Sequence, residues 1–133
     1  MKKVLIAATS AILLITLGIY LFFILPNEKN LDVIRNMPIE NVDLNKINDG
    51  VYKGDFSYGS HTYKVEVSVI EHKLEKIDVI SNRDSSHAKK AEGVISRILE
   101  EQSLDVDVVS GATTTSKALL KAVENALKSS PKI

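Results

Sequence analysis

The chain of 133 residues contains no cysteine and no tryptophan, and aromatic residues make up only 5% of it. The absence of cysteine excludes disulfides, catalytic thiolates, cysteine-ligated zinc, iron–sulfur clusters and a lipidated N-terminal cysteine. Charge of one sign is not in excess either, because 17 Lys and Arg balance 17 Asp and Glu. A nucleic-acid-binding domain normally has a strong basic excess, so we expect no nucleic-acid partner.

The sequence also lacks the patterns of two kinds of catalytic site. The three histidines, His61, His72 and His87, are far apart and do not form the HExxH-type pair of a zinc site. No order of Ser, His and Asp and no pair of carboxylates stands out as a hydrolytic site. We therefore expect neither a metal site nor a hydrolase.

One long hydrophobic run is present. Val4–Leu25 holds 22 residues without a charge, follows Lys2 and Lys3, and ends at Pro26. As a helix it would be about 33 Å long, enough to cross a hydrocarbon core of about 30 Å. A cleaved signal peptide has a shorter apolar segment and small residues at its cleavage site, whereas bulky residues fill this end of the run. The pattern favours an uncleaved membrane anchor over residues 1–26.

The basic residues predict the orientation of this anchor. By the positive-inside rule, Lys2 and Lys3 stay in the cytoplasm, and the rest of the chain lies outside the cytoplasmic membrane. A polar connector is expected over residues 27–48. Beyond residue 26 the chain has 15 basic and 17 acidic side chains, since only two lysines precede that point, which gives a net charge of −2. Such a mildly acidic domain has no polybasic surface.

Three segments show the two-residue alternation of β-strands. They lie at residues 51–58, 61–71 and 74–81. The central segment places four apolar side chains on one face: Tyr63, Val65, Val67 and Val69. Short turns join the three segments, so we predict an antiparallel meander.

Two amphipathic helices are predicted after the strands. The first runs from about residue 88 to 102, behind a cap at Ser85 or Ser86. A short β-prone run follows at 104–109, and the last helix has its apolar stripe within 119–127. In the chain, the predicted strands therefore come first and the predicted helices follow them.

The predicted fold class is α+β. A small antiparallel sheet packs with two amphipathic helices over residues 49–130, and a single N-terminal transmembrane helix precedes this domain. A domain of this size buries one modest core and leaves no room for a large substrate cavity.

The segment Ser110–Ser116, before the last helix, is rich in hydroxyl groups. Five of its seven residues are Ser or Thr, and the other two are Gly111 and Ala112. One interpretation is a helix cap, in which a hydroxyl oxygen accepts an unpaired N–H of the first turn. The other is an anion site, because free N–H groups and the helix dipole attract phosphate and small residues let it approach the backbone. The spacing is not that of a P-loop.

The same region resembles a known family. Residues 107–127, with Asp107 followed by Ser110–Thr113, closely resemble the C-terminal signature of the FMN-binding domain family. Asp49–Gly54 is similar to the family's opening Asp-Gly-x-Tyr-x-Gly strand. The family includes the flavin-bearing subunits of the RNF electron-transport complex and of the sodium-translocating NADH:quinone oxidoreductase. The resemblance covers about residues 49–128 and is stronger to short stand-alone members, because the Glu-Thr-Pro-Gly-type loop of those larger proteins is missing.

This resemblance implies FMN joined by a phosphoester to the threonine after Gly-Ala, which is Thr113 here. It also implies a partner, a magnesium-dependent flavin transferase outside the cell that takes FMN from FAD and releases AMP. That enzyme would recognise Asp107 and Ser110–Ala112. The neighbouring threonines leave the attachment atom open. The predicted cofactor-binding residues are Ser110, Gly111, Ala112, Thr113, Thr114, Thr115, Ser116 and His87.

Other side chains near this region have two interpretations each. His87 lies near the predicted start of the first helix and could approach the flavin, or it is a surface or capping residue. Four aromatic residues could stack on the isoalloxazine ring or pack in the core. They are Tyr52, Phe56, Tyr58 and Tyr63.

The function predicted from these features is a membrane-anchored extracytoplasmic flavoprotein. It would relay electrons between a membrane donor and an external or membrane acceptor, and it would not be an enzyme on its own. Three alternatives stay open. They are a module that binds FMN non-covalently, a cofactor-free structural or regulatory membrane protein, and an FMN domain that serves a partner reductase in trans.

Overall fold

The computed structural model describes residues 1–24 and 32–130. The chain divides into two compact units, Met1–Asn36 and Met37–Ile133. The end of the predicted anchor and the start of the predicted connector, residues 25–31, lie outside the described residues.

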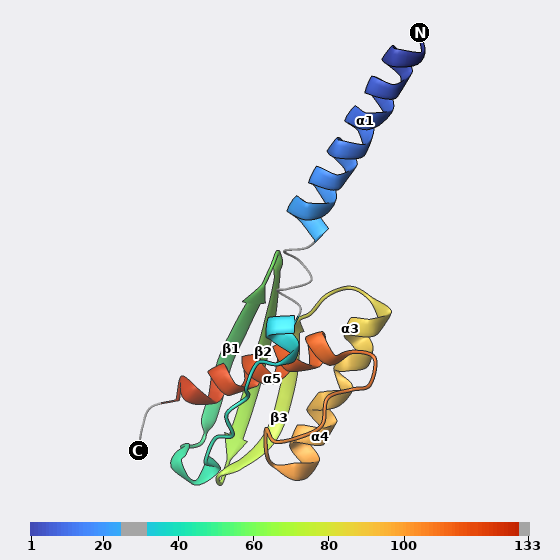
Figure 1. Ribbon diagram of the computed structural model, residues 1–133. Helices are drawn as coiled ribbons and strands as arrows, with labels where there is room; N and C mark the ends of the chain where they lie inside the picture. Colours follow the sequence, from blue (N-terminus) through green and yellow to red (C-terminus); the bar gives the residue numbers. More distant parts are fainter. Residues whose placement is uncertain (25–31, 131–133) are drawn as a thin grey trace. The chain divides into compact units, whose positions relative to one another are not determined.

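The first unit is mainly one apolar helix. α1 (Lys2–Ile19) continues into the π-helix η1 (Tyr20–Ile24) (Figure 1). No residue of α1 is buried, and Lys2–Phe22 is long and apolar enough to cross a membrane, with a mean hydropathy of 2.4. The Ser and Thr hydroxyls of α1 donate to carbonyl groups one turn earlier, so these polar groups are paired within the helix. The helix is a candidate transmembrane span, as the sequence predicts.

The second unit is built on a three-stranded sheet. β1 (Gly50–Tyr58), β2 (His61–Ile70) and β3 (Lys73–Ser81) are antiparallel and lie in the order β1-β2-β3, which confirms the predicted meander. The apolar face predicted for the central strand is the one that is buried. Its four residues are at most 1% exposed: Tyr63, Val65, Val67 and Val69.

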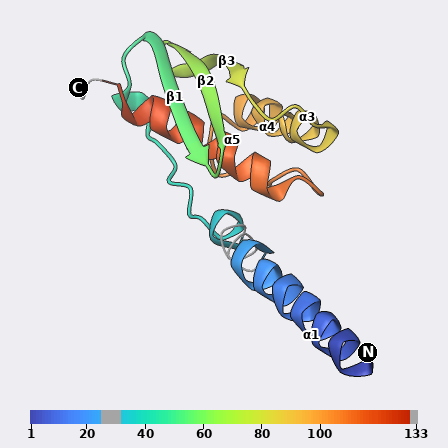
Figure 2. The same cartoon turned by 90° about the horizontal axis from the view of Figure 1, so that it is seen from above.

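Within residues 37–130, three α-helices complete this unit. They are α3 (Ser86–Ala91), α4 (Gly93–Glu101) and α5 (Thr113–Lys128). Figures 1 and 2 show α5 lying across one face of the sheet, with α3 and α4 beside β3. Within residues 37–130 no helix covers the opposite face of the sheet. The fold is therefore α+β, as predicted.

The single helix predicted after the sheet is interrupted at Glu92. The side chain of Asn82 explains the break, because its Nδ2 donates both to the carbonyl oxygen of Ala88 (2.9 Å) and to Oε1 of Glu92 (3.0 Å). In a continuous helix that carbonyl would accept the N–H of Glu92. The Glu92 N–H instead donates to Lys89 O at 3.2 Å, which tightens the turn. The predicted cap is present, because Ser85 Oγ accepts the Ala88 N–H at 3.1 Å.

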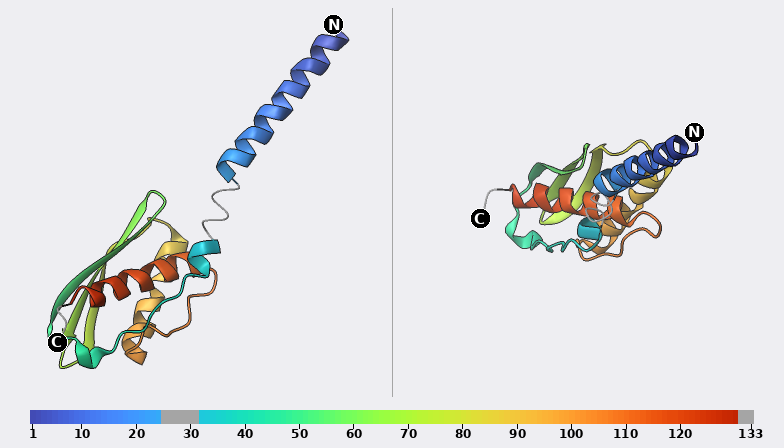
Figure 3. Two further views of the ribbon diagram at one scale, coloured as in Figure 1. Left: turned by 60° about the vertical axis from the view of Figure 1, so that its left-hand side comes forward. Right: turned by 45° about the horizontal axis from the view of Figure 1, so that its top comes forward.

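Residues 37–47, which the sequence assigns to the connector, pack against α5. We call this segment the strap. Figures 2 and 3 show α5 between the sheet and the strap, which contains the short 3-10 helix η2 (Leu44–Lys46). Ile47 at its end is only 2% exposed, and Asn41 Oδ1 accepts the N–H of Leu104 at 3.1 Å. The strap is therefore part of the compact unit.

Glu124 of α5 is a fully buried carboxylate that binds the strap. Its Oε1 accepts the N–H of Glu40 at 2.8 Å, and its Oε2 lies 2.5 Å from Nζ of Lys121. Lys128 Nζ contacts Glu124 Oε1 at 3.4 Å and Glu40 Oε2 at 2.5 Å. Burial alone would raise the pKa of Glu124. The hydrogen bonds from Lys121 and Glu40, with the two lysine charges, outweigh burial and hold this pKa below its usual value.

Replacing this carboxylate by an amide tests the ion-pair network. Glu124→Gln is expected to lower the free energy of unfolding at pH 7 by about 1–3 kcal/mol, because Lys121 loses its charged partner. Since the folded pKa is depressed, the wild-type stabilisation exists above the usual value of 4.5 and is lost as the pH falls below it. The difference between the two proteins should therefore stay constant above pH 4.5 and shrink as the pH falls from there through the lower folded pKa. Urea unfolding followed by far-UV circular dichroism measures it.

Glu75→Gln is the matched control for that experiment. Glu75 is exposed on β3 and forms no ion pair within the described residues. Its replacement should change the free energy of unfolding by no more than about 0.5 kcal/mol. Equal losses in the two variants, or a Glu124→Gln deficit that does not shrink as the pH falls through the depressed pKa of Glu124, would contradict the interpretation.

Candidate functional site

The hydroxyl-rich segment predicted as the site leads directly into α5. Residues 105–109 before it have no regular secondary structure, so the β-prone run does not form a strand. α5 begins at Thr113, and its N-cap is Ala112, with no side-chain hydrogen bond at the cap. The interpretation of Ser110–Ser116 as a hydroxyl cap is therefore wrong, and the N–H groups of the first turn of α5 have no side-chain partner among residues 1–24 and 32–130.

Backbone and buried side-chain contacts fix this segment. The Oγ of Ser116, which is fully buried, accepts the N–H of Val109 at 3.2 Å. The N–H of Ala112 donates to the carbonyl oxygen of Val109 at 3.0 Å and closes a turn. Gly111 lies in that turn with φ at 79°, in the left-handed region where side chains are strained. The hydroxyl of Ser116 is thus used inside the fold, and the glycine is required by the backbone.

Other polar groups of the segment are free to meet a ligand. Ser110 is exposed, and Thr113 and Thr114 are half-buried. None of these three hydroxyls has a hydrogen-bond partner in the part of the chain that the structure describes. Thr115 is only 8% exposed. Free N–H groups beside accessible hydroxyls fit a phosphate bound at the start of a helix.

The remaining predicted residues lie elsewhere. His87 is exposed on the first turn of α3, and no hydrogen bond within residues 32–130 joins it to the 110–116 segment. The four aromatic residues considered for stacking belong to the core or pack against it: Tyr52, Phe56, Tyr58 and Tyr63. Among the described residues, the hydroxyls of Tyr58 and Tyr63 are buried without a hydrogen-bond partner.

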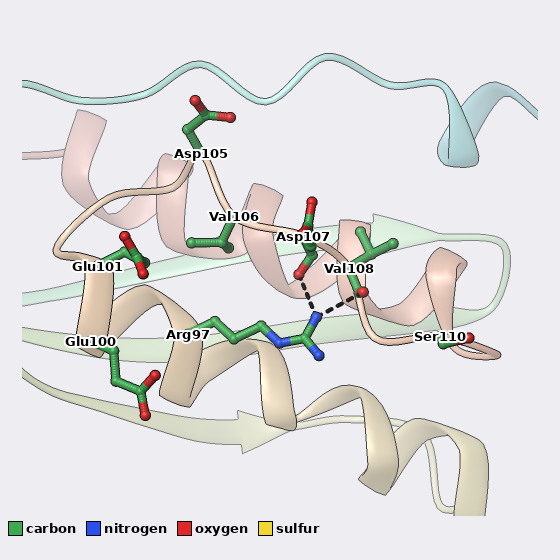
Figure 4. Close-up of a pocket in the computed structure, with 8 residues that line it drawn as sticks. All are labelled: Arg97, Glu100, Glu101, Asp105, Val106, Asp107, Val108 and Ser110. Atoms are coloured by element: carbon green, nitrogen blue, oxygen red, sulfur yellow. Dashed lines mark hydrogen bonds between the residues drawn. The ribbon is translucent and has the colours of Figure 1, made fainter.

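A groove of about 580 Å³ borders Ser110 (Figure 4). Arg97 of α4 extends along it, and its Nη1 donates to the carbonyl oxygens of Asp107 and Val108, each at 2.8 Å. Sequence reasoning missed Arg97, because a single basic residue on an amphipathic helix has no distinguishing pattern. Four carboxylate side chains line the same groove: Glu100, Glu101, Asp105 and Asp107.

Comparison with known proteins identifies relatives of this region. A family model described as "FMN-binding domain" matches residues 58–128, which is more than half of the chain. An uncharacterised protein of Treponema pallidum (strain Nichols) is 36% identical over 85 residues, which cover 62% of this chain and 24% of that protein. An NADH:acrylate oxidoreductase of Vibrio harveyi is 33% identical over 96 residues, 71% of this chain and 9% of that protein. This chain therefore spans a minor part of the length of each relative.

Proposed function

Because this chain belongs to the FMN-binding domain family, we propose that it carries FMN covalently on Thr113 and relays electrons at the outer face of the cytoplasmic membrane. Family membership makes the chain an FMN-binding module. The covalent bond, the relay and the extracytoplasmic location are our proposal. One observation carries it, namely the first turn of α5, where no described residue pairs with the hydroxyl of Thr113 and no described side chain caps the N–H groups beside it.

Attachment would join Oγ1 of Thr113 to the phosphorus of FMN. In this transfer the new oxygen–phosphorus bond forms, the phosphoanhydride bond of FAD breaks, AMP leaves, and the hydroxyl proton is released. A threonine hydroxyl is a weak nucleophile, so a magnesium-dependent flavin transferase must activate it. The phosphodiester that results keeps one negative charge, which the N–H groups and dipole of α5 stabilise.

The proposed relay divides the work between the flavin and the chain. Bound FMN supplies one- and two-electron chemistry, and the chain supplies attachment, orientation and electrostatics. The similarity to a segment of the Vibrio NADH:acrylate oxidoreductase supports a module that exchanges electrons with other redox groups. We propose a membrane donor and an external or membrane acceptor as its partners, and we propose that the chain is not a self-contained enzyme.

The proposed location follows from the first unit. Lys2–Phe22 is a candidate membrane span, and two lysines stand at its N-terminal end. The positive-inside rule then favours a cytoplasmic N-terminus and an extracytoplasmic second unit. A covalent cofactor suits that location, because a dissociating flavin would be diluted outside the cell.

One experiment tests attachment and location together. The full chain is produced in bacteria with a flavin transferase, and membranes are denatured and separated by gel electrophoresis. We expect a flavin-fluorescent band near the chain mass of 14.6 kDa in the membrane fraction, and we expect protease added to intact spheroplasts to remove it. A dark band would favour non-covalent binding or a cofactor-free protein. A fluorescent band that resists the protease would overturn the extracytoplasmic location.

A further inference from the structure

We infer that Arg97 is a positioning residue for flavin attachment. This inference rests on the proposed function, in which Thr113 carries the flavin. Arg97 lies on α4, sixteen positions before Thr113 in the sequence, and it is half-buried. It holds the backbone of Asp107 and Val108 and so presents Ser110–Thr113 to the flavin transferase. Its effect would pass through the conformation of this segment and not through contact with the reacting atoms.

The hydrogen bonds of Arg97 show why a cation is needed there. The carbonyl oxygens of Asp107 and Val108 both lie 2.8 Å from the same nitrogen, Nη1 (Figure 4). Two consecutive carbonyl groups that converge on one point carry like partial charges close together, and this arrangement is unfavourable without a donor between them. The charged guanidinium supplies strong hydrogen bonds to both. Without it, the two peptide groups are expected to turn apart.

The held residues are directly continuous with the attachment site. Val109 comes next, and its N–H and carbonyl groups pair with Ser116 Oγ and with the N–H of Ala112. Residues 105–109 have no strand or helix to fix them, so these individual bonds define their path. A change at Asp107 and Val108 is therefore transmitted along the chain to the N-cap of α5.

The charges of the groove argue against a direct phosphate contact by Arg97. Four carboxylates line the groove with this one cation, so its net charge is negative and repels an anion. The guanidinium forms no salt bridge with any of them in the described part of the chain. Its hydrogen bonds to Asp107 and Val108 both go to backbone carbonyl groups, which identifies its role as support for the backbone.

The test measures flavin transfer to the purified full chain in detergent, with FAD, magnesium and a purified transferase. Arg97→Met should lower kcat/KM for the chain at least about tenfold, mainly through KM, and leave the KM for FAD unchanged. The kcat/KM of Arg97→Lys should be at least about threefold higher than that of Arg97→Met, because one ammonium can donate to two carbonyl groups. Amide hydrogen exchange at Val109 and Ala112 should be faster in the Met variant.

Arg83→Met is the matched control. Arg83 is exposed, and its side chain has no hydrogen-bond partner within the described residues, so its loss should change kcat/KM less than about twofold. Two results would overturn this inference and leave the proposed function standing. One is a folded Arg97→Met chain with the wild-type kcat/KM, and the other is a Lys variant as impaired as the Met variant. A wild-type chain that accepts no flavin overturns the proposed function, and this inference with it.

Discussion

Thr113→Val is expected to abolish covalent flavin, whereas Thr114→Val leaves it intact. Valine has nearly the shape of threonine and lacks the hydroxyl, so it removes the acceptor atom at little cost to packing. Both residues belong to the first turn of α5 and both are half-buried. Consecutive side chains of a helix point about 100° apart, so the hydroxyls of Thr113 and Thr114 face different directions. A transferase that approaches along the Ser110–Ala112 turn therefore reaches only one of the two. Thr113 directly follows that turn.

Fluorescence after denaturing electrophoresis, with the flavin peptide located by mass spectrometry, measures this prediction. Thr113→Ser is the conservative variant and should retain attachment, because it keeps the hydroxyl. Fluorescence that survives in Thr113→Val and disappears in Thr114→Val would move the attachment to Thr114. Thr115 is a poorer acceptor, since it is only 8% exposed.

The sheet could be predicted from the sequence because its signal is local. The apolar side chains of β2 alternate strictly between Tyr63 and Val69, and one face of a strand must be buried for that pattern to be stable. The stripe of α5 is equally regular, which predicted a buried final helix. The candidate site was found through a resemblance of residues 107–127, which physical pattern alone would not have separated from a helix cap.

The missed features are contacts between segments far apart in the chain. The N–H of Glu40 donates to Glu124, 84 residues later, and no periodic pattern marks such a pair. Arg97 likewise reaches the backbone ten and eleven positions away. The break at Glu92 depends on the amide of Asn82, which competes for a helix carbonyl. Each is a side-chain bond made possible by the tertiary fold, so local propensity does not reveal it.

Gly54→Ala is expected to destabilise the second unit by about 3 kcal/mol or more. At Gly54, β1 lies close against the backbone of α5. A Cβ at this position would lie 2.1 Å from the carbonyl oxygen of Ala122 and 2.3 Å from the nitrogen of Ala126. These are backbone atoms, so no side chain can rotate away to make room. The helix and the strand would have to separate.

That separation would cost contacts on both sides of the helix. Asn125 Nδ2 donates to the carbonyl oxygen of Asp55 at 2.8 Å, and this bond would break as α5 moves outward. The strap lies against the other side of α5 and binds it through Glu124, so it would also be displaced. Urea unfolding of the full chain, followed by far-UV circular dichroism, should show a lower midpoint. Limited proteolysis should cut the variant faster.

Gly93→Ala makes the same chemical change where space exists. A Cβ there would lie 3.5 Å from Cγ2 of Val109, an ordinary van der Waals distance, and alanine favours the helix by up to about 1 kcal/mol over glycine. Its free energy of unfolding should therefore stay equal or rise. If Gly54→Ala unfolded at the wild-type urea midpoint, α5 could not pack on β1 as closely as described. If both variants lost stability equally, the loss would reflect added bulk in general and not the contact at Gly54.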